Sequence, residues 1–167
     1  MKRNRGFTLV ELMVALAVLA ILLGISIPSY REFVANNRMT AQANDLISAF
    51  SLARSEAVKR AANVTVCVSS DGASCTGGVN WEQGWIVTAD TADPNAVIRM
   101  QQALGGNSTL TIPAATNIVF NATGATTLAA NTTLTLCPPA PAIVQGRVIQ
   151  IERSGRPRVD NLTANCP

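Results

Sequence analysis

Histidine is absent from this chain of 167 residues. Its absence excludes Ser-His-Asp and Cys-His catalytic arrangements, imidazole metal sites and a histidine general base. Aromatic residues make up only 4% of the chain and charged residues 14%, whereas hydrophobic residues make up 48%. So apolar a composition, with a net charge of +3, is not that of an intrinsically disordered protein. We expect one folded domain with an appendage, no enzyme activity and no cofactor.

The excess of positive charge lies in the first five residues. Lys2, Arg3 and Arg5 account for it, because the rest of the chain has ten basic and ten acidic side chains. Within that rest, residues 61–142 have one arginine against four acidic residues, and residues 143–167 have four arginines against two. A polyanionic partner is therefore expected to meet the C-terminal end.

A run of 21 mainly apolar residues, Phe7–Ile27, is interrupted by one charge, Glu11. As a helix it would measure about 31 Å, close to the thickness of the hydrocarbon layer of a bilayer. The basic residues before it predict a cytoplasmic N-terminus and an exported remainder. A cleaved signal peptide is the alternative, but it would have a shorter apolar core that ends at a small-residue cleavage site. We expect a single membrane-spanning helix.

The segment around Gly6 resembles a known processing signal. Lys-Arg-Asn-Arg-Gly at residues 2–6, followed by Phe-Thr-Leu-Val-Glu-Leu, is similar to the type III signal of type IV pilins and of the pseudopilins of type II secretion. The resemblance implies that a prepilin peptidase cuts between Gly6 and Phe7, that the new N-terminus is methylated and that the helix joins a filament core. The amino group of Phe7 on a neighbouring subunit could then pair with Glu11. The alternative is a stray charge near the bilayer edge.

Helical periodicity continues beyond the apolar run. Pro28 predicts a kink or a weak stretch around Gly24–Pro28, because proline removes a backbone donor. Apolar residues then recur at spacings of three and four, at Ala43, Leu46, Ile47, Phe50, Ala53 and Ala57. This spacing predicts an amphipathic helix that ends near residues 60–62. Its apolar stripe faces either the chain's own globular domain or a partner.

From Asn63 onward the periodicity becomes that of β-strands. Alternating and β-branched residues predict strands at 64–68, 85–88, 118–120, 134–136 and 148–151. Between them, residues 123–133 are rich in threonine and alanine and are expected to contain an exposed loop.

The middle of the chain resembles a particular family. The segment Leu52–Arg60, the Val-x-Val-Cys sequence at 64–67 and Trp-x-x-Gly-Trp-x-Val at 81–87 are similar to the GspH/FimT family of minor pilins and pseudopilins. The resemblance implies an α+β, type IV pilin-like fold, in which a long N-terminal helix packs on antiparallel β-sheets. Four segments are expected: a leader peptide (1–6), a transmembrane and filament-core helix (7–27), an amphipathic helix (28–61) and a C-terminal β domain (62–167).

Four cysteines lie on the expected exported side, where oxidation is favoured. Their spacing contains no Cys-x-x-Cys pair and no histidine can complete a ligand set, so no metal site is expected. Of the three possible pairings we predict Cys67 with Cys75 and Cys137 with Cys166. The closed loops correspond to about 2.6 and 3.6 kcal/mol of stabilisation. The second bridge would hold the arginine-bearing tail against the sheet.

The sequence Gly155-Arg156-Pro157-Arg158 resembles the Gly-Arg-x-Arg motif near the C-terminus of FimT-type minor pilins, which bind DNA in natural transformation. In an extended stretch Arg156 and Arg158 would project to one side, about 6.6 Å apart, and bind phosphates without sequence preference. Arg153 and Arg147 are expected to assist. Residues 143–167 contain no aromatic residue, so base stacking is not expected. The alternative is a solvated hairpin edge protected by charge.

Three functions remain open. The first is a minor type IV pilin near the pilus tip that binds double-stranded DNA during uptake. The second is a minor pilin that primes assembly without binding DNA, and the third is the H-type pseudopilin of a type II secretion system. Each implies a single-pass inner-membrane protein with a periplasmic domain that later enters a pilus or pseudopilus. The expected partners are other major and minor pilins and the prepilin peptidase.

Overall fold

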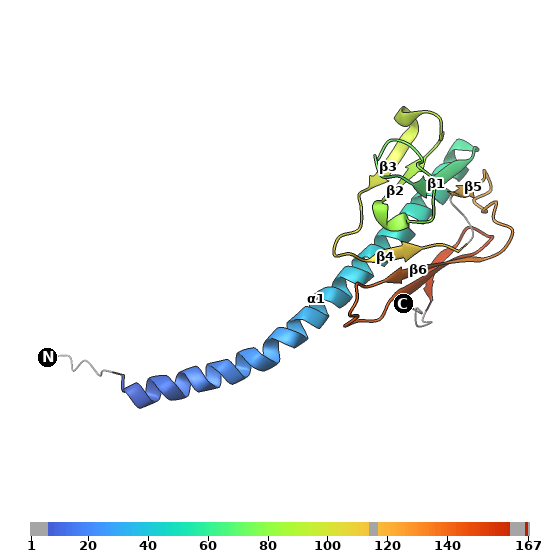
Figure 1. Ribbon diagram of the computed structural model, residues 1–167. Helices are drawn as coiled ribbons and strands as arrows, with labels where there is room; N and C mark the ends of the chain where they lie inside the picture. The colour runs from blue at the N-terminus through green and yellow to red at the C-terminus, as the bar shows by residue number, and fades with distance from the viewer. Residues whose placement is uncertain (1–6, 114–116, 161–165, 167) are drawn as a thin grey trace.

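One long helix projects from a domain of two β-sheets (Figure 1). The structure is a computed structural model that describes residues 7–113, 117–160 and 166. The expected leader peptide, with Gly6 and the N-terminal basic residues, lies outside the described residues. The α+β architecture expected from the sequence is present.

Helix α1 spans Leu9–Arg60. It begins after Thr8, whose side-chain oxygen accepts a hydrogen bond from the backbone N–H of Glu11 at 3.2 Å. It ends at Ala61, which adopts the left-handed conformation that commonly terminates helices. The helix continues through Pro28, and Figure 1 shows a gentle curve along its length without a break.

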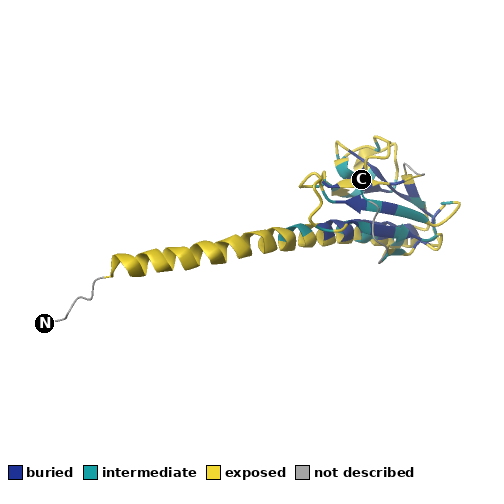
Figure 2. Cartoon of the chain, turned by 60° about the horizontal axis from the view of Figure 1, so that its bottom comes forward, coloured by how far each residue is buried: buried dark blue, intermediate teal, exposed yellow. Residues whose placement is uncertain are grey.

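The two halves of α1 differ in burial (Figure 2). Every side chain from Phe7 to Phe33 is exposed, and this half contains a stretch that is long and apolar enough to cross a membrane. The other half buries one face against the domain. Of the six apolar positions predicted to form the stripe, five are buried and Ile47 is half-buried, and the same face includes Met39, Gln42 and Ala49.

Two antiparallel sheets cover this buried face. The first has the strand order β3-β2-β1-β5 and the second the order β4-β6-β7-β8. The strands are β1 (Val64–Val68), β2 (Trp85–Thr88), β3 (Val97–Gln101), β4 (Thr109–Thr111), β5 (Asn117–Phe120), β6 (Thr132–Cys137), β7 (Arg147–Ile151) and β8 (Pro157–Asp160). The sequence predicted β1, β2, β5, β6 and β7 and did not predict β3, β4 or β8.

Aromatic side chains fill the space between the helix and the sheets. Phe50 of α1 lies 6.3 Å, between ring centroids, from both Trp81 and Phe120. Trp81 and Trp85 are at most 1% exposed, as expected for tryptophans with a core role. Short 3-10 helices at Trp81–Gln83 and Pro94–Ala96 complete the described secondary structure.

Cys67 is bonded to Cys75, and Cys137 to Cys166, which are the two pairings chosen from the sequence. The first bridge closes a loop around Asp71. The Asp71 carboxylate accepts hydrogen bonds from the side chain and backbone of Ser74, the backbone of Ala73 and the side chain of Ser69, and these bonds hold its pKa well below the usual range. The second bridge attaches the end of the chain to β6, beside β7.

Candidate nucleic-acid interface

The candidate arginines lie on the hairpin formed by β7 and β8. The two strands are joined by a tight turn in which Gly155 N–H donates to the Glu152 carbonyl at 2.9 Å. Glu152 N–H donates to the Arg156 carbonyl at 3.1 Å and closes the turn. Of the residues predicted to be extended, Pro157 and Arg158 lie in β8, and Arg156 directly precedes this strand. Proline is tolerated there because β8 is the edge strand and Pro157 is its first residue.

Gly155 has a structural role in this turn. Its φ is +78°, in the left-handed region that favours glycine. Gly155 is also buried, and a Cβ atom at this position would overlap the backbone carbonyl of Gly124 in the β5–β6 loop, residues 121–131. The expected exposed loop is therefore only partly exposed, since Gly124 and Thr126 are buried.

Arg158 is already engaged by neighbouring side chains. It pairs across the hairpin with Gln150, to whose side-chain oxygen its Nε donates at 2.8 Å. Its Nη1 lies 3.6 Å from Oε1 of Glu152. Because the Arg158 side chain is 57% exposed, this ion pair contributes little to stability and can be exchanged for another anion.

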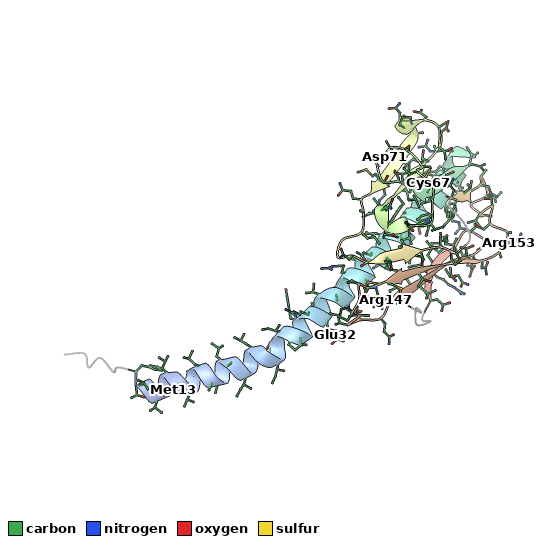
Figure 3. All side chains as sticks on the ribbon, in the orientation of Figure 1. Met13, Glu32, Cys67, Asp71, Arg147 and Arg153 are labelled. Carbon is green, nitrogen blue, oxygen red and sulfur yellow. A yellow bond between two sulfur atoms is a disulfide. The ribbon has the colours of Figure 1, made fainter. Side chains whose placement is uncertain are left out.

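Arg156 and Arg153 are the more available cations. Both are exposed, and neither guanidinium makes a hydrogen bond or an ion pair within the described part of the chain. The backbone of Arg153 is fixed, however, because its carbonyl accepts from Thr126 N–H at 2.9 Å and its N–H donates to Oδ1 of Asn131 at 3.1 Å. Figure 3 shows Arg153 at the end of the domain that is remote from the projecting helix.

The structure separates Arg147 from the other three arginines. Arg147 begins β7, which spans about 13 Å, and Arg153 lies in the turn beyond its end. Arg158 pairs with Gln150, which faces the opposite side of the sheet from Arg147. Figure 3 shows the two side chains at opposite ends of the hairpin, with Arg147 beside α1. Its Nη2 donates to Oδ1 of Asn36 at 2.6 Å and its Nη1 to the Gln145 carbonyl at 2.9 Å. Arg147 thus joins β7 to α1, and its predicted grouping with the hairpin arginines does not fit this geometry.

The surface of the hairpin turn suits phosphates better than bases. Gln150 and Arg158 share the outward face of the sheet, opposite the core residues Ile149 and Ile151. Among the described residues, the exposed aromatic side chains are Phe7, Tyr30 and Phe33, which lie in α1 or just before it and not at the turn. The turn therefore offers guanidinium groups for charge-assisted hydrogen bonds and no ring for stacking.

A second surface feature lies where α1 enters the domain. A groove of about 450 Å³ runs between α1 and the β6–β7 loop. Its lining is largely apolar, and it includes Tyr30, which is 69% exposed, and Ile143, which is 56% exposed. Arg31 and Arg38 also line it.

The two residues expected to act in processing and assembly lie at the free end of α1. Phe7 is 73% exposed and precedes the helix, and Glu11 is exposed in its first turn. Gly6, the other residue of the expected cleavage site, is outside the described residues. In the part of the chain that the structure describes, no group of three or more cysteine or acidic residues is placed to bind a metal ion.

The fold is that of a type IV pilin. The structure superimposes on a crystal structure of the type IV minor pilin FimU of Pseudomonas aeruginosa with a TM-score of 0.63 and 20% sequence identity. The match covers 80% of this chain and 97% of that one, and a second crystal form of FimU gives a TM-score of 0.60. Residues 1–27 match the prokaryotic N-terminal methylation motif, and residues 42–155 match the family described as type II transport protein GspH. The chain belongs to the GspH family, which confirms the resemblance seen in the sequence.

The chain spans less than half of the length of the curated relatives that it matches. A fimbrial protein of Pseudomonas aeruginosa is 38% identical over 58 residues, which are 35% of this chain and 37% of that protein. The type IV major pilin protein PilA of Myxococcus xanthus is 38% identical over 53 residues, 32% of this chain and 24% of PilA. The prepilin peptidase-dependent protein D of Escherichia coli is 34% identical over 82 residues, about half of each chain.

Several residues of the site could not be found from the sequence. Thr126, Asn131 and Gly124 contact the hairpin turn from a loop more than 20 residues away in the chain. Gln150 and Glu152 approach Arg158 only because of the hairpin register. The sequence offered one signal, for Gln150. It alternates with Ile149 and Ile151, which indicates that its side chain faces away from the core.

Replacing Gly155 with alanine should destabilise the domain and displace the turn. A positive φ alone costs about 1–3 kcal/mol for a residue with a side chain, and the overlap with Gly124 adds to this cost. Urea unfolding of the two proteins measures the difference. Gly77→Ala is the matched control, because Gly77 has a φ of +72° but open space around its Cβ position. Equal losses for both variants would contradict the close contact between Gly155 and Gly124.

Proposed function

We propose that this chain is a minor type IV pilin that enters a pilus near its tip and binds double-stranded DNA, without sequence preference, through the β7–β8 turn. Three findings support the proposal: membership of the GspH family, the type IV pilin fold, and the cluster of Arg153, Arg156 and Arg158. The observation that carries the DNA-binding part is the exposure of Arg156, with no ion-pair partner among the described residues.

The arrangement of the molecule, with the apolar half of α1 at one end and the turn arginines at the other, fits this role. The exposed apolar half of α1 anchors the chain in the inner membrane before assembly and in the filament core afterwards. The hairpin turn lies at the opposite end of the domain, as Arg153 in Figure 3 illustrates. A subunit held by its helix would therefore present the arginines away from its anchor, where a long polyanion can reach them.

The chemistry of the turn is phosphate binding. Two or three guanidinium groups on one surface displace condensed counterions from DNA, so affinity falls as the salt concentration rises. Each guanidinium can bind phosphate oxygens through two N–H donors. This binding does not depend on the base sequence. No catalytic step is assigned to these residues.

A second candidate function is assembly without DNA binding, either in a pilus or as the H-type pseudopilin of a type II secretion system. The groove between α1 and the β6–β7 loop favours it, because its exposed apolar lining suits a neighbouring subunit. The family description, which refers to type II transport, points in the same direction. A single chain could serve assembly through this groove and DNA through the hairpin turn.

Processing is expected to leave Phe7 as the N-terminal residue of the mature protein. Mass spectrometry of the membrane-extracted protein should find a methylated Phe7, and Gly6→Leu should leave the precursor uncut. Glu11→Ala should be cut normally but enter filaments poorly, because a carboxylate that pairs with the Phe7 amino group of a neighbour is removed. A mature N-terminus at any other residue would refute this part of the proposal.

The salt dependence of DNA binding should reflect how many of the turn arginines contact phosphates. For two or three neutralised phosphates, the logarithm of the affinity should fall with the logarithm of salt with a slope of about −2 to −3. Arg156→Gln should make this slope shallower by about one unit and leave the melting temperature unchanged. Gel-shift titrations at several salt concentrations measure the slope.

Arg147→Gln is the matched control for this experiment, because it removes the same charge from the far end of the hairpin. Its DNA affinity and salt slope should equal those of the parent. If Arg156→Gln binds DNA as well as the parent, the DNA-binding proposal fails and the assembly function takes its place.

Glu152→Gln should strengthen DNA binding. The substitution removes a carboxylate that lies 3.6 Å from the Arg158 guanidinium and competes with phosphate for it. An exposed ion pair of this kind corresponds to a two- to fivefold increase in affinity, which should shrink at higher salt as the charges are screened. Fluorescence anisotropy with labelled duplex DNA measures the change. An unchanged or lower affinity would show that Arg158 does not contact DNA.

A further inference from the structure

The β5–β6 loop, residues 121–131, holds the backbone of the hairpin turn from outside the hairpin. Thr126 N–H donates to the Arg153 carbonyl at 2.9 Å, and the Thr126 hydroxyl lies 3.3 Å from the same oxygen. Asn131 accepts the N–H of Arg153 at 3.1 Å. Both backbone polar groups of Arg153 are therefore satisfied by this loop and not by the hairpin itself.

The β5–β6 loop is in turn fixed to α1. Its first turn is closed by Asn121, whose side-chain oxygen accepts from the N–H groups of Thr123 and Ala125 at 3.0 and 3.1 Å. The Gly124 that follows faces Arg54 and Val58 near the end of α1, which leave little room for a side chain. A continuous set of contacts thus runs from the helix, through the loop, to the turn that carries Arg153 and Arg156.

We propose that Thr126 and Asn131 are positioning residues for DNA binding, which fix the turn so that Arg153 and Arg156 face phosphates without first being ordered. This inference rests on the proposed function. Neither residue carries a charge, so neither can neutralise a phosphate. Their effect is to lower the entropic cost of binding, because a turn that is already fixed loses less freedom when it meets its partner.

A positioning role and a direct phosphate contact predict different results. In full-length processed protein, Asn131→Ala combined with Thr126→Val should lower the affinity for a short labelled DNA duplex three- to tenfold, the size of one or two net hydrogen bonds. The salt slope should stay that of the parent, because all arginines remain. The Arg153 amide should exchange its hydrogen faster, since it has lost its acceptor.

Two further variants serve as controls. Thr132→Val removes a hydroxyl from the first residue of β6, directly after the loop. Among the described residues this hydroxyl bonds to the Ala130 carbonyl and not to the hairpin, so the variant should bind DNA as the parent does. Thr126→Ser keeps the hydroxyl and should also bind as the parent. Asn131→Ala alone changes an exposed side chain and should leave the protein folded. It therefore provides the test if the double variant does not fold.

The possible failures are distinguishable. If the parent does not bind DNA, the proposed function is wrong and the positioning role falls with it. If the parent binds and Arg156→Gln weakens binding, but the double variant binds as tightly as the parent, only the positioning role is refuted. A shallower salt slope in the double variant would also refute it, because a phosphate contact would then have been lost.

Discussion

The packing of one face of α1 against two sheets determines where every other feature of this protein lies. Phe50 is at the centre of this packing, since its ring lies near those of Trp81, in the 3-10 helix that contacts β4, and Phe120 of β5. Both sheets are small, and neither could bury its apolar face without the helix. The same helix leaves its other half fully exposed. A single element therefore contributes to the core of the domain and also carries an exposed apolar stretch long enough to cross a membrane.

The position of the hairpin turn depends on this packing. The last turns of α1 support the β5–β6 loop at Gly124, and the loop supports the turn at Gly155 and Arg153. Two glycines in close backbone contact allow this arrangement. The exposed arginines thus project from a backbone that is fixed on several sides, which is the arrangement that favours binding without a large loss of entropy.

Much of the fold was predictable because its signals are local. The apolar run and the stripe through Phe50 define α1, and five strands follow from β-branched residues. Three strands were missed for physical reasons: β4 has only three residues, β3 has a charged and an exposed residue in its middle, and β8 begins with proline and contains two charges. Such strands depend on pairing with neighbours more than on their own propensity.

The site was predictable only in part for a related reason. The motif located Arg156 and Arg158 on the chain, but the distance of Arg147, the ion pair with Glu152 and the support from Thr126 and Asn131 all depend on register and tertiary contacts. The glycine of the motif is explained by a neighbour 31 positions earlier in the chain. None of these contacts has a signature in a single sequence.

The central claim is that the β7–β8 turn is the surface that meets DNA. The most direct test is to follow backbone amide signals of a protein that begins near Tyr30 by NMR while duplex DNA is added. The account predicts that the largest shifts fall on residues 153–158 and that Arg147 and the groove beside Tyr30 are unaffected. Shifts centred on the groove, or no shifts at the turn, would contradict it.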